Sequence, residues 1–264
     1  MKYYPPRFLF RRYELLKRIE TGVSFLEIGP GSLNLTGDLL KFFEKGLLVD
    51  YNSEIKQYFK AFQSSESSKM SLVIADFIDF TINDYYDTVV ACEVLEHIEE
   101  ETVFLSKTYK ILEANGQLIL SVPARKKYWS VHDEGVGHLR RYERKELVDL
   151  LQTVGFTNIE VVSYGFPFVN ILRFPRILLA KQQKTHNSSL SKKAQTQESG
   201  LSQYRVMPEL LGFLCNKYTI APMAAFSSLF NKFAHAAQSL HAHRRKVYSF
   251  SPEQSLQNLS LLPF

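Results

Sequence analysis

The stretch SFLEIGPGSLNLTGDLL at residues 24–40 joins an apolar run to a helical pattern through a turn with almost no side chains. The apolar run ends at Glu27, and Gly29 and Gly31 follow with a proline between them. Glycine permits a positive φ and lets other atoms approach the backbone closely. Two interpretations fit: a tight strand-to-helix turn, or a ligand that lies on the turn against the N-terminus of the following helix.

Acidic residues stand at the ends of the next apolar runs. Asp50 closes the second run, nineteen residues after Gly31, and Asp76 follows the third. A carboxylate at the end of a second strand can accept two hydrogen bonds from a ribose diol, although it can equally cap a helix. The segment ACEVLEHIEE then ends the fourth run. Polar or glycine chemistry at four strand ends predicts a ligand site along one edge of a sheet.

The elements that must position these residues alternate between strand and helix as far as residue 163. We expect strands at 23–28, 46–50, 71–75, 86–92, 117–122 and 157–163, and helices at 7–20, 35–44, 53–62, 99–113 and 143–154. Continuous apolar strands separated by helices predict an α/β fold: a Rossmann-like, mostly parallel central sheet covered by helices on both faces. Right-handed crossovers then bring the carboxyl ends of the strands to one edge, where ligands bind in open α/β sheets.

The pattern changes after residue 163, which divides the chain into a core at 1–163 and a C-terminal helical lid or extension at 164–264. Within the extension, 181–203 is polar and is expected to be a flexible segment. The apolar, arginine-containing segment 164–180 predicts a lid over the site, peripheral contact with a membrane, or helices packed on the core. We interpret 246–250 as a short strand and the last residues as a frayed tail.

Composition limits the class of protein. With 264 residues, 45% of them hydrophobic and 22% charged, the chain is typical of a soluble globular protein. Cys92 and Cys215 form no CxxC motif, which indicates a reducing compartment without disulfides or a zinc–thiolate site. The sequence shows neither a secretory signal nor a membrane-spanning run, so we expect a cytoplasmic protein. The net charge of +5 is scattered, whereas enzymes acting on nucleic acid typically show a dense basic face.

From about residue 20 to 163 the order of these motifs resembles the class I S-adenosylmethionine-dependent methyltransferases. The segment EIGPGS matches the acid-x-Gly-x-Gly loop of that family. The resemblance implies that Gly29 and Gly31 admit the methionine and ribose portion of S-adenosyl-L-methionine and that Glu27 helps to hold its amino end. Leu33 stands where the family's loop often has a third glycine.

The resemblance extends to the later strand ends. It implies that Asp50 binds the ribose, that Asp76 contacts the adenine amino group, and that Phe77 is a neighbouring backbone or stacking contact. The segment EVLEHI resembles the start of the active-site wall in many family members, with Glu93 near the cofactor. Methyl transfer from a sulfonium needs no covalent protein intermediate, so the protein has to align the reacting atoms and exclude water.

The segment CEVLEHIEE also permits a metal site. Glu93, Glu96 and His97 have i, i+3, i+4 spacing and would share one face of a helix. With His132 or His138 they could ligate a divalent metal, as a comparable E-x-x-E-H site does in some RNA and phenol O-methyltransferases. In the other interpretation Glu96 and His97 cap and orient the next helix. Because many relatives with the same residues have no known metal, we predict none.

The loop after the fifth strand, with the sequence GHLRRY, carries the candidate groups for the acceptor. His138, with His132 as a second candidate, could act as a general base near neutral pH. Arg140 and Arg141 could bind a carboxylate or phosphate, and Tyr142 could pack and donate a hydrogen bond. Alternatively, these last residues brace the loop against the sheet. We expect a small-molecule or lipid-linked acceptor rather than a nucleic acid or a folded protein.

Other functions remain open at this point. A nicotinamide-dependent oxidoreductase would share the sheet and the acid at Asp50, but Asn34 occupies the third glycine position of its fingerprint. A non-catalytic cofactor-binding module is a further alternative, disfavoured by the intact acids and glycines. The last is a metal-assisted O-methyltransferase that acts on RNA or a phenol. The sequence does not indicate an oligomeric state.

Overall fold

The structure is a computed structural model that describes residues 6–66, 69–165, 222–223, 226 and 258–263. Most of the extension expected at 164–264 lies outside the described residues, including the polar segment 181–203 and the strand expected at 246–250. None of the helices in the described ranges is long and apolar enough to cross a membrane.

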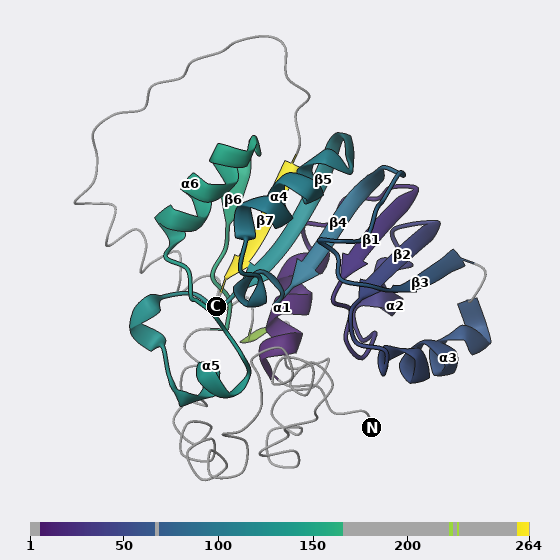
Figure 1. Ribbon diagram of the computed structural model, residues 1–264, viewed down its shortest axis with the longest axis horizontal. Coiled ribbons are helices and arrows are strands. Elements are labelled where there is room, and N and C mark those ends of the chain that lie inside the picture. Colours follow the sequence, from purple (N-terminus) through teal and green to yellow (C-terminus); the bar gives the residue numbers. More distant parts are fainter. Residues whose placement is uncertain (1–5, 67–68, 166–221, 224–225, 227–257, 264) are drawn as a thin grey trace.

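A single parallel sheet organises the described part of the chain (Figure 1). Its strands are β1 (Ser24–Ile28), β2 (Lys45–Asp50), β3 (Met70–Ile74), β4 (Tyr86–Cys92), β5 (Leu112–Val122), β6 (Ile159–Val161) and β7 (Asn258–Pro263). Their order is β3-β2-β1-β4-β5-β7-β6, and every recorded pairing is parallel. This sheet confirms the expected Rossmann-like α/β class.

Strand β7 corrects the expectation of a frayed C-terminal tail. Residues Asn258–Pro263 pair with β5 from Gln117 to Val122 on one side and with β6 from Ile159 to Val161 on the other. The last strand of the chain therefore belongs to the sheet of the core. A parallel neighbour so distant in the sequence leaves no local signal, because its partners lie on other strands.

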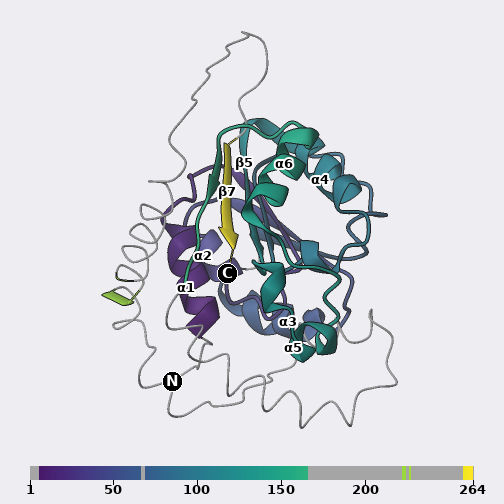
Figure 2. The same cartoon turned by 90° about the vertical axis from the view of Figure 1, so that its left-hand side faces the viewer.

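Helices cover both faces of the sheet, as the alternating pattern predicts. They are α1 (Pro6–Leu16), α2 (Thr36–Leu39), α3 (Ile55–Glu66), α4 (Glu101–Lys110), α5 (Val131–Gly135) and α6 (Arg144–Val154), with two short 3₁₀ helices, η2 (Leu95–His97) and η3 (Lys126–Tyr128). Figure 2 shows α1 and α2 on one side of the sheet and α4 and α6 on the other. The helix expected at 35–44 is reduced to the single turn of α2.

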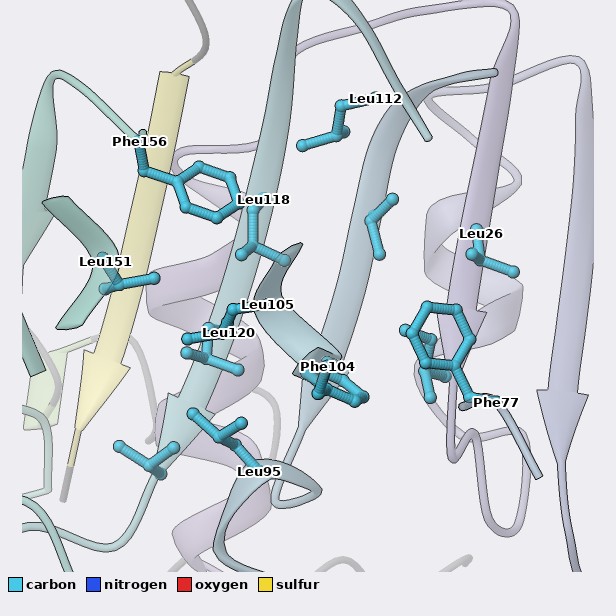
Figure 3. Packing of buried hydrophobic residues seen from close by; sticks show 14 of the residues in the cluster. Leu26, Phe77, Leu95, Phe104, Leu105, Leu112, Leu118, Leu120, Leu151 and Phe156 are labelled. Carbon is cyan, nitrogen blue, oxygen red and sulfur yellow. The ribbon is translucent and has the colours of Figure 1, made fainter. Parts of the chain in front are cut away.

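Successive residues of each strand point to opposite faces, which divides the core into two clusters. On the side of α1, α2 and α3 the cluster contains Phe25, Leu48, Val90 and Ile119 of the strands and Leu9, Phe10, Leu15, Leu39 and Ile55 of the helices. On the opposite side, seen in Figure 3, it contains Leu26, Val49, Val89, Leu118 and Leu120 of the strands and Phe104, Leu105, Leu147 and Leu151 of α4 and α6. Both faces are therefore closed to water, and the strand ends are left to bind a ligand.

The carboxyl ends of the central strands meet along one edge of the sheet. Ile28 is in register with Val49 on β2 and with Ala91 on β4, and Cys92 is in register with Ser121 on β5. The loop after β1 stays attached to this edge, because the Gly29 N–H donates to the Val49 carbonyl at 2.9 Å. The residues that follow each strand are therefore neighbours in space.

The place of β7 between β5 and β6 predicts a large effect of shortening the chain. A chain that ends at residue 257 loses the strand that bonds to both β5 and β6. We expect the midpoint of thermal unfolding to fall by at least about 5 °C, since about 1 kcal/mol moves it by roughly 2–4 °C in a domain of this size. Circular dichroism measures the shift, and a chain lacking only Phe264 is the control. An unchanged midpoint would exclude β7 from the folded sheet.

Candidate active site at the carboxyl edge of the sheet

The glycine loop after β1 turns through backbone that favours glycine. Gly29 and Gly31 have φ values of +64° and +56°. A Cβ on Gly29 would come within 2.8 Å of Val94 Cγ2, so a side chain there is excluded by space as well as by conformation. Leu33, which stands at the third-glycine position, also has a positive φ of +56° and is buried. The chain keeps the left-handed turn there without the glycine.

Asp50 lies beside this loop as a buried carboxylate. Its oxygen Oδ1 accepts the Asn52 N–H at 2.9 Å, and the Gly31 N–H lies near enough to favour the charged carboxylate. Burial raises the pKa of Asp50, while these two backbone N–H groups oppose the rise. The hydrogen bond from Gly29 to Val49 holds the glycine loop against the end of β2, so the loop and Asp50 are neighbours.

Glu27 is the buried acid at the end of β1. Thr36 Oγ1, at the start of α2, donates to Glu27 Oε2 at 2.7 Å. Burial raises the pKa of Glu27 to about 7, against the hydrogen bond from Thr36 and the positive charge of Arg11, while the charge of Asp50 adds to the rise. A cation next to this carboxyl group would stabilise its charged form, which burial disfavours.

Asp76 and Phe77 follow β3, and they differ in which of their groups can contact a ligand. Asp76 is half-buried and organises the turn: its Oδ1 accepts the Ile78 N–H at 3.1 Å. The Phe77 ring packs against Phe104 with ring centroids 5.1 Å apart, inside the core cluster of Figure 3. The ring is therefore engaged in the core, which favours the backbone of Phe77 over its ring as the contact, and the role of Phe77 stays a prediction.

Glu93 is held by two arginines that sequence reasoning missed. It has a φ of +59° and pairs with Arg7 and, at 3.5 Å, with Arg11, both from α1. Ser121 Oγ at the end of β5 donates to Glu93 Oε1 at 2.9 Å. The arginines are one helical turn apart on a helix whose other side is apolar, and that spacing was the available signal. Helix α1 thus supplies positive charge to the strand-end edge.

Glu96, His97 and His138 form a second group, the Glu–His–His cluster. Their candidate ligand atoms all lie within 4.8 Å of one another. Glu96 is fully buried, and neither of its carboxylate oxygens has a hydrogen-bond partner among the described residues. The His97 and His138 rings meet edge to face with centroids 4.9 Å apart. Glu93 is not in the cluster, because the helix needed to align it begins only at Leu95.

His138 is oriented by Asp133 of α5. Its Nδ1 lies 2.9 Å from Asp133 Oδ1, and its Nε2 faces Glu96 Oε1 at 3.7 Å. Burial alone would raise the pKa of Asp133, but the hydrogen bond from His138 and the adjacent Arg141 guanidinium hold it well below its usual range. The Leu139 N–H donates to the Glu96 carbonyl at 2.8 Å, which fixes the loop against η2.

Arg140, Arg141 and Tyr142 all make contacts within the protein. Arg141 pairs with Asp133 at 2.6 Å, and Arg140 pairs with Glu101 at 2.7 Å. The Tyr142 hydroxyl donates to Glu101 Oε2 at 2.8 Å. These contacts brace the loop, and a role in binding substrate stays a prediction for the three residues.

His132, on α5, is half-buried and lies six residues after the start of η3 and six before His138. It is not part of the Glu–His–His cluster. Its catalytic role also stays a prediction.

Comparison with known proteins identifies the class of this domain. A family model described as "Methyltransferase domain" matches residues 1–161. The chain belongs to this methyltransferase family. The resemblance to class I S-adenosylmethionine-dependent methyltransferases seen in the sequence is thereby confirmed, and S-adenosylmethionine is the cofactor of that family.

Individual relatives of the methyltransferase domain are distant. A probable S-adenosylmethionine-dependent methyltransferase of Mycolicibacterium smegmatis is 32% identical over 72 residues, which cover 26% of this chain and 28% of that protein. Among solved structures, the [4+2]-cyclase SpnF has a TM-score of 0.52 at 16% identity, covering 74% of this chain and 73% of its own. The YcgJ protein of Bacillus subtilis has a TM-score of 0.51 at 12% identity, covering 72% of this chain and 91% of its own. At these identities the two structures show the fold alone.

The raised pKa of Glu27 predicts how the stability of the methyltransferase domain depends on pH. The folded state favours protonated Glu27, so this contribution to stability is fully present below pH 4.5 and is lost as the pH rises to about 7. The loss is on the order of 3 kcal/mol. In Glu27→Gln the side chain stays neutral, so the free energy of unfolding of the wild type should fall relative to the variant between these pH values.

Urea denaturation of both proteins at several pH values from 4.5 to 8 measures this difference. Glu100→Gln, which changes an exposed acid just before α4, is the control and should follow the wild type. Parallel pH profiles for Glu27→Gln and the wild type would contradict the raised pKa.

Proposed function

We propose that the chain binds S-adenosylmethionine on the glycine loop and transfers its methyl group to a small-molecule or lipid-linked acceptor. The observation that carries the proposal is the place of the buried Asp50 carboxylate beside the glycine loop, which the Gly29 N–H holds to the carbonyl of Val49, the residue before Asp50. This arrangement brings together the two parts of a nucleoside site, a loop that lets a ligand approach the backbone and an acid that can bind a ribose diol.

The remaining acids suit the rest of the cofactor. Glu27 is a buried carboxyl whose pKa of about 7 favours a cationic neighbour, which fits the amino end of the methionine part. Arg11 acts electrostatically on Glu27 and can balance the carboxylate of the same part. Asp76 and the backbone of Phe77 stand at the end of the third strand, where the adenine edge would lie.

The cofactor supplies an electrophilic methyl group, and the protein's residues have to orient the acceptor and exclude water. The acceptor would enter between the Glu–His–His cluster and the arginines of α1. His138 could take the acceptor's proton, because Asp133 orients its ring and holds the proton on Nδ1. Helix α5 and the loop after β5 lie beyond the arrowhead end of the sheet in Figure 1.

The class of acceptor rests on indirect features. Two histidines and two arginines within residues 132–141 favour an anionic or hydroxyl-bearing group, and the scattered basic residues disfavour a nucleic acid. A metal-assisted O-methyltransferase is the second candidate, favoured by the Glu–His–His cluster. Because a [4+2]-cyclase shares the fold, methyl transfer itself has to be measured.

Cofactor binding can be measured by isothermal titration of the purified chain. We expect micromolar affinity for S-adenosylmethionine or S-adenosylhomocysteine. Asp50→Ala should weaken it by about 1–3 kcal/mol, because charge-assisted hydrogen bonds to the ribose hydroxyls are lost. Gly31→Arg should abolish it by filling the space of the cofactor. Asp149→Ala, on the exposed side of α6, is the control and should bind normally.

Titration with NAD under the same conditions tests the alternative that the chain binds a nicotinamide cofactor. Binding of NAD without binding of S-adenosylmethionine would overturn the proposal. Wild-type affinity in Asp50→Ala would remove that residue from the site and leave the family assignment intact.

The acceptor can be sought with radiolabelled methyl donor in cell extracts separated into lipid, small-molecule, RNA and protein pools. We expect label in the lipid or small-molecule pool, and none with Gly31→Arg. Label that enters the RNA or protein pool would contradict the proposed acceptor class. No transfer to any pool, with normal cofactor binding, would favour a non-catalytic module or another reaction.

A further inference from the structure

Glu96 is the least satisfied polar side chain of the described core. Its exposed fraction is 0%, and both carboxylate oxygens are buried without a hydrogen-bond partner among the described residues. Burying a carboxylate costs several kcal/mol unless the charge is paired or bound to a metal, and buried polar groups without partners are rare. His138 Nε2 lies 3.7 Å from Glu96 Oε1.

We propose that the Glu–His–His cluster binds one divalent first-row transition-metal ion through Glu96, His97 and His138. The distance between Glu96 Oε1 and His138 Nε2 is too long for a hydrogen bond. It does suit two ligands of one ion, because bonds of about 2.1 Å in a tetrahedral site place the ligand atoms about 3.4 Å apart. The three ligand atoms lie within 4.8 Å of one another, so a modest contraction would bring all three to an ion.

Hydrogen bonds outside the cluster give both imidazoles the tautomer that a metal requires. His138 Nδ1 lies 2.9 Å from Asp133 Oδ1, and His97 Nδ1 lies 3.2 Å from the Gly137 carbonyl oxygen. Both oxygens can only accept, so the proton is on Nδ1 of each ring and Nε2 carries the lone pair. Carboxylates and carbonyls commonly orient metal-bound histidines in this way. Arg141 in turn fixes Asp133 at 2.6 Å.

The donor set indicates which ions fit. Two imidazoles and one carboxylate favour zinc, iron, cobalt or manganese over magnesium and calcium, which prefer oxygen ligands throughout. Three protein ligands leave a position for water or for an oxygen of the acceptor. This last step rests on the proposed function, whereas the ion site does not.

Glu93 is not a ligand of the proposed metal ion. It was grouped with Glu96 and His97 by helical spacing, but it pairs with Arg7 and Arg11. A bound ion would occupy the Nε2 lone pair of His138, so metal binding and a general-base role for His138 are alternatives that one experiment can separate.

Titration of the purified, chelator-treated chain with Co²⁺ and Zn²⁺ tests the site. We expect one ion per chain by calorimetry, and visible Co²⁺ absorption bands typical of a nitrogen- and oxygen-ligated site. Glu96→Gln and His97→Gln should each weaken binding by at least about tenfold. Glu93→Gln, which removes an acid of the same motif outside the cluster, and the exposed Glu100→Gln are matched controls that should bind as the wild type does.

The proposal is overturned if the wild type binds no stoichiometric ion. It is equally overturned if neither ligand variant weakens binding, or if Glu93→Gln weakens it as much as Glu96→Gln does. Should Glu96→Gln not fold, the Co²⁺ bands of the wild type and the His97→Gln titration still decide. Titration of the same wild-type sample with S-adenosylmethionine keeps the two proposals apart, because failure to bind the ion leaves cofactor binding untouched.

Discussion

The buried carboxylate of Asp50 accepts the Asn52 N–H and lies beside the glycine loop, whose Gly29 N–H donates to the Val49 carbonyl. The site depends on this last hydrogen bond because it holds the loop after β1 against the end of β2. Parallel pairing brings the strand ends together, but it does not set the path of the loops beyond them. The glycine loop can turn sharply since Gly29 and Gly31 adopt positive φ values, and the hydrogen bond to Val49 then anchors the turn. We propose that S-adenosylmethionine, the cofactor of the family, binds at this loop beside Asp50.

Two kinds of buried carboxylate lie along this edge of the sheet, and they differ in their hydrogen bonds. Glu27 and Asp50 accept hydrogen bonds from the protein and lie at the glycine loop. Glu96 is equally buried but accepts none from the described residues, and it faces two imidazoles. Charges that are buried need compensation. In this account the first pair receives it from backbone N–H groups, a threonine and the cofactor, and Glu96 receives it from a metal ion.

The grouping of the glycine loop with Glu27 and Asp50 could be predicted from the sequence because its signals are local. Glu27 lies within β1, the glycine loop follows this strand directly, and Asp50 ends an apolar run, so residue type and order along the chain are sufficient to group them. The helical spacing that would group Glu93 with Glu96 and His97 does not hold, because Glu93 has a positive φ and η2 begins two residues later. The sequence also could not show that the Phe77 ring packs against Phe104, since the direction of a side chain after a strand depends on such packing.

Other features depend on contacts distant in the sequence. The arginines of α1 reach Glu93 across more than eighty residues, and β7 pairs with β5 across more than a hundred and thirty. No window of sequence contains both partners of these contacts. His138 was predicted as a catalytic group from its type, but its relation to Asp133 and Glu96 appeared only with the fold.

The central claim, that Asp50 and the glycine loop form the cofactor site, is tested most directly by a crystal structure of the chain with S-adenosylhomocysteine. The account predicts that both ribose hydroxyls lie within hydrogen-bond distance of the Asp50 carboxylate, with the methionine part over Gly29 and Gly31 and the adenine beside Asp76. A ligand bound elsewhere on the chain, with Asp50 contacting only the backbone of Gly31 and Asn52, would contradict it.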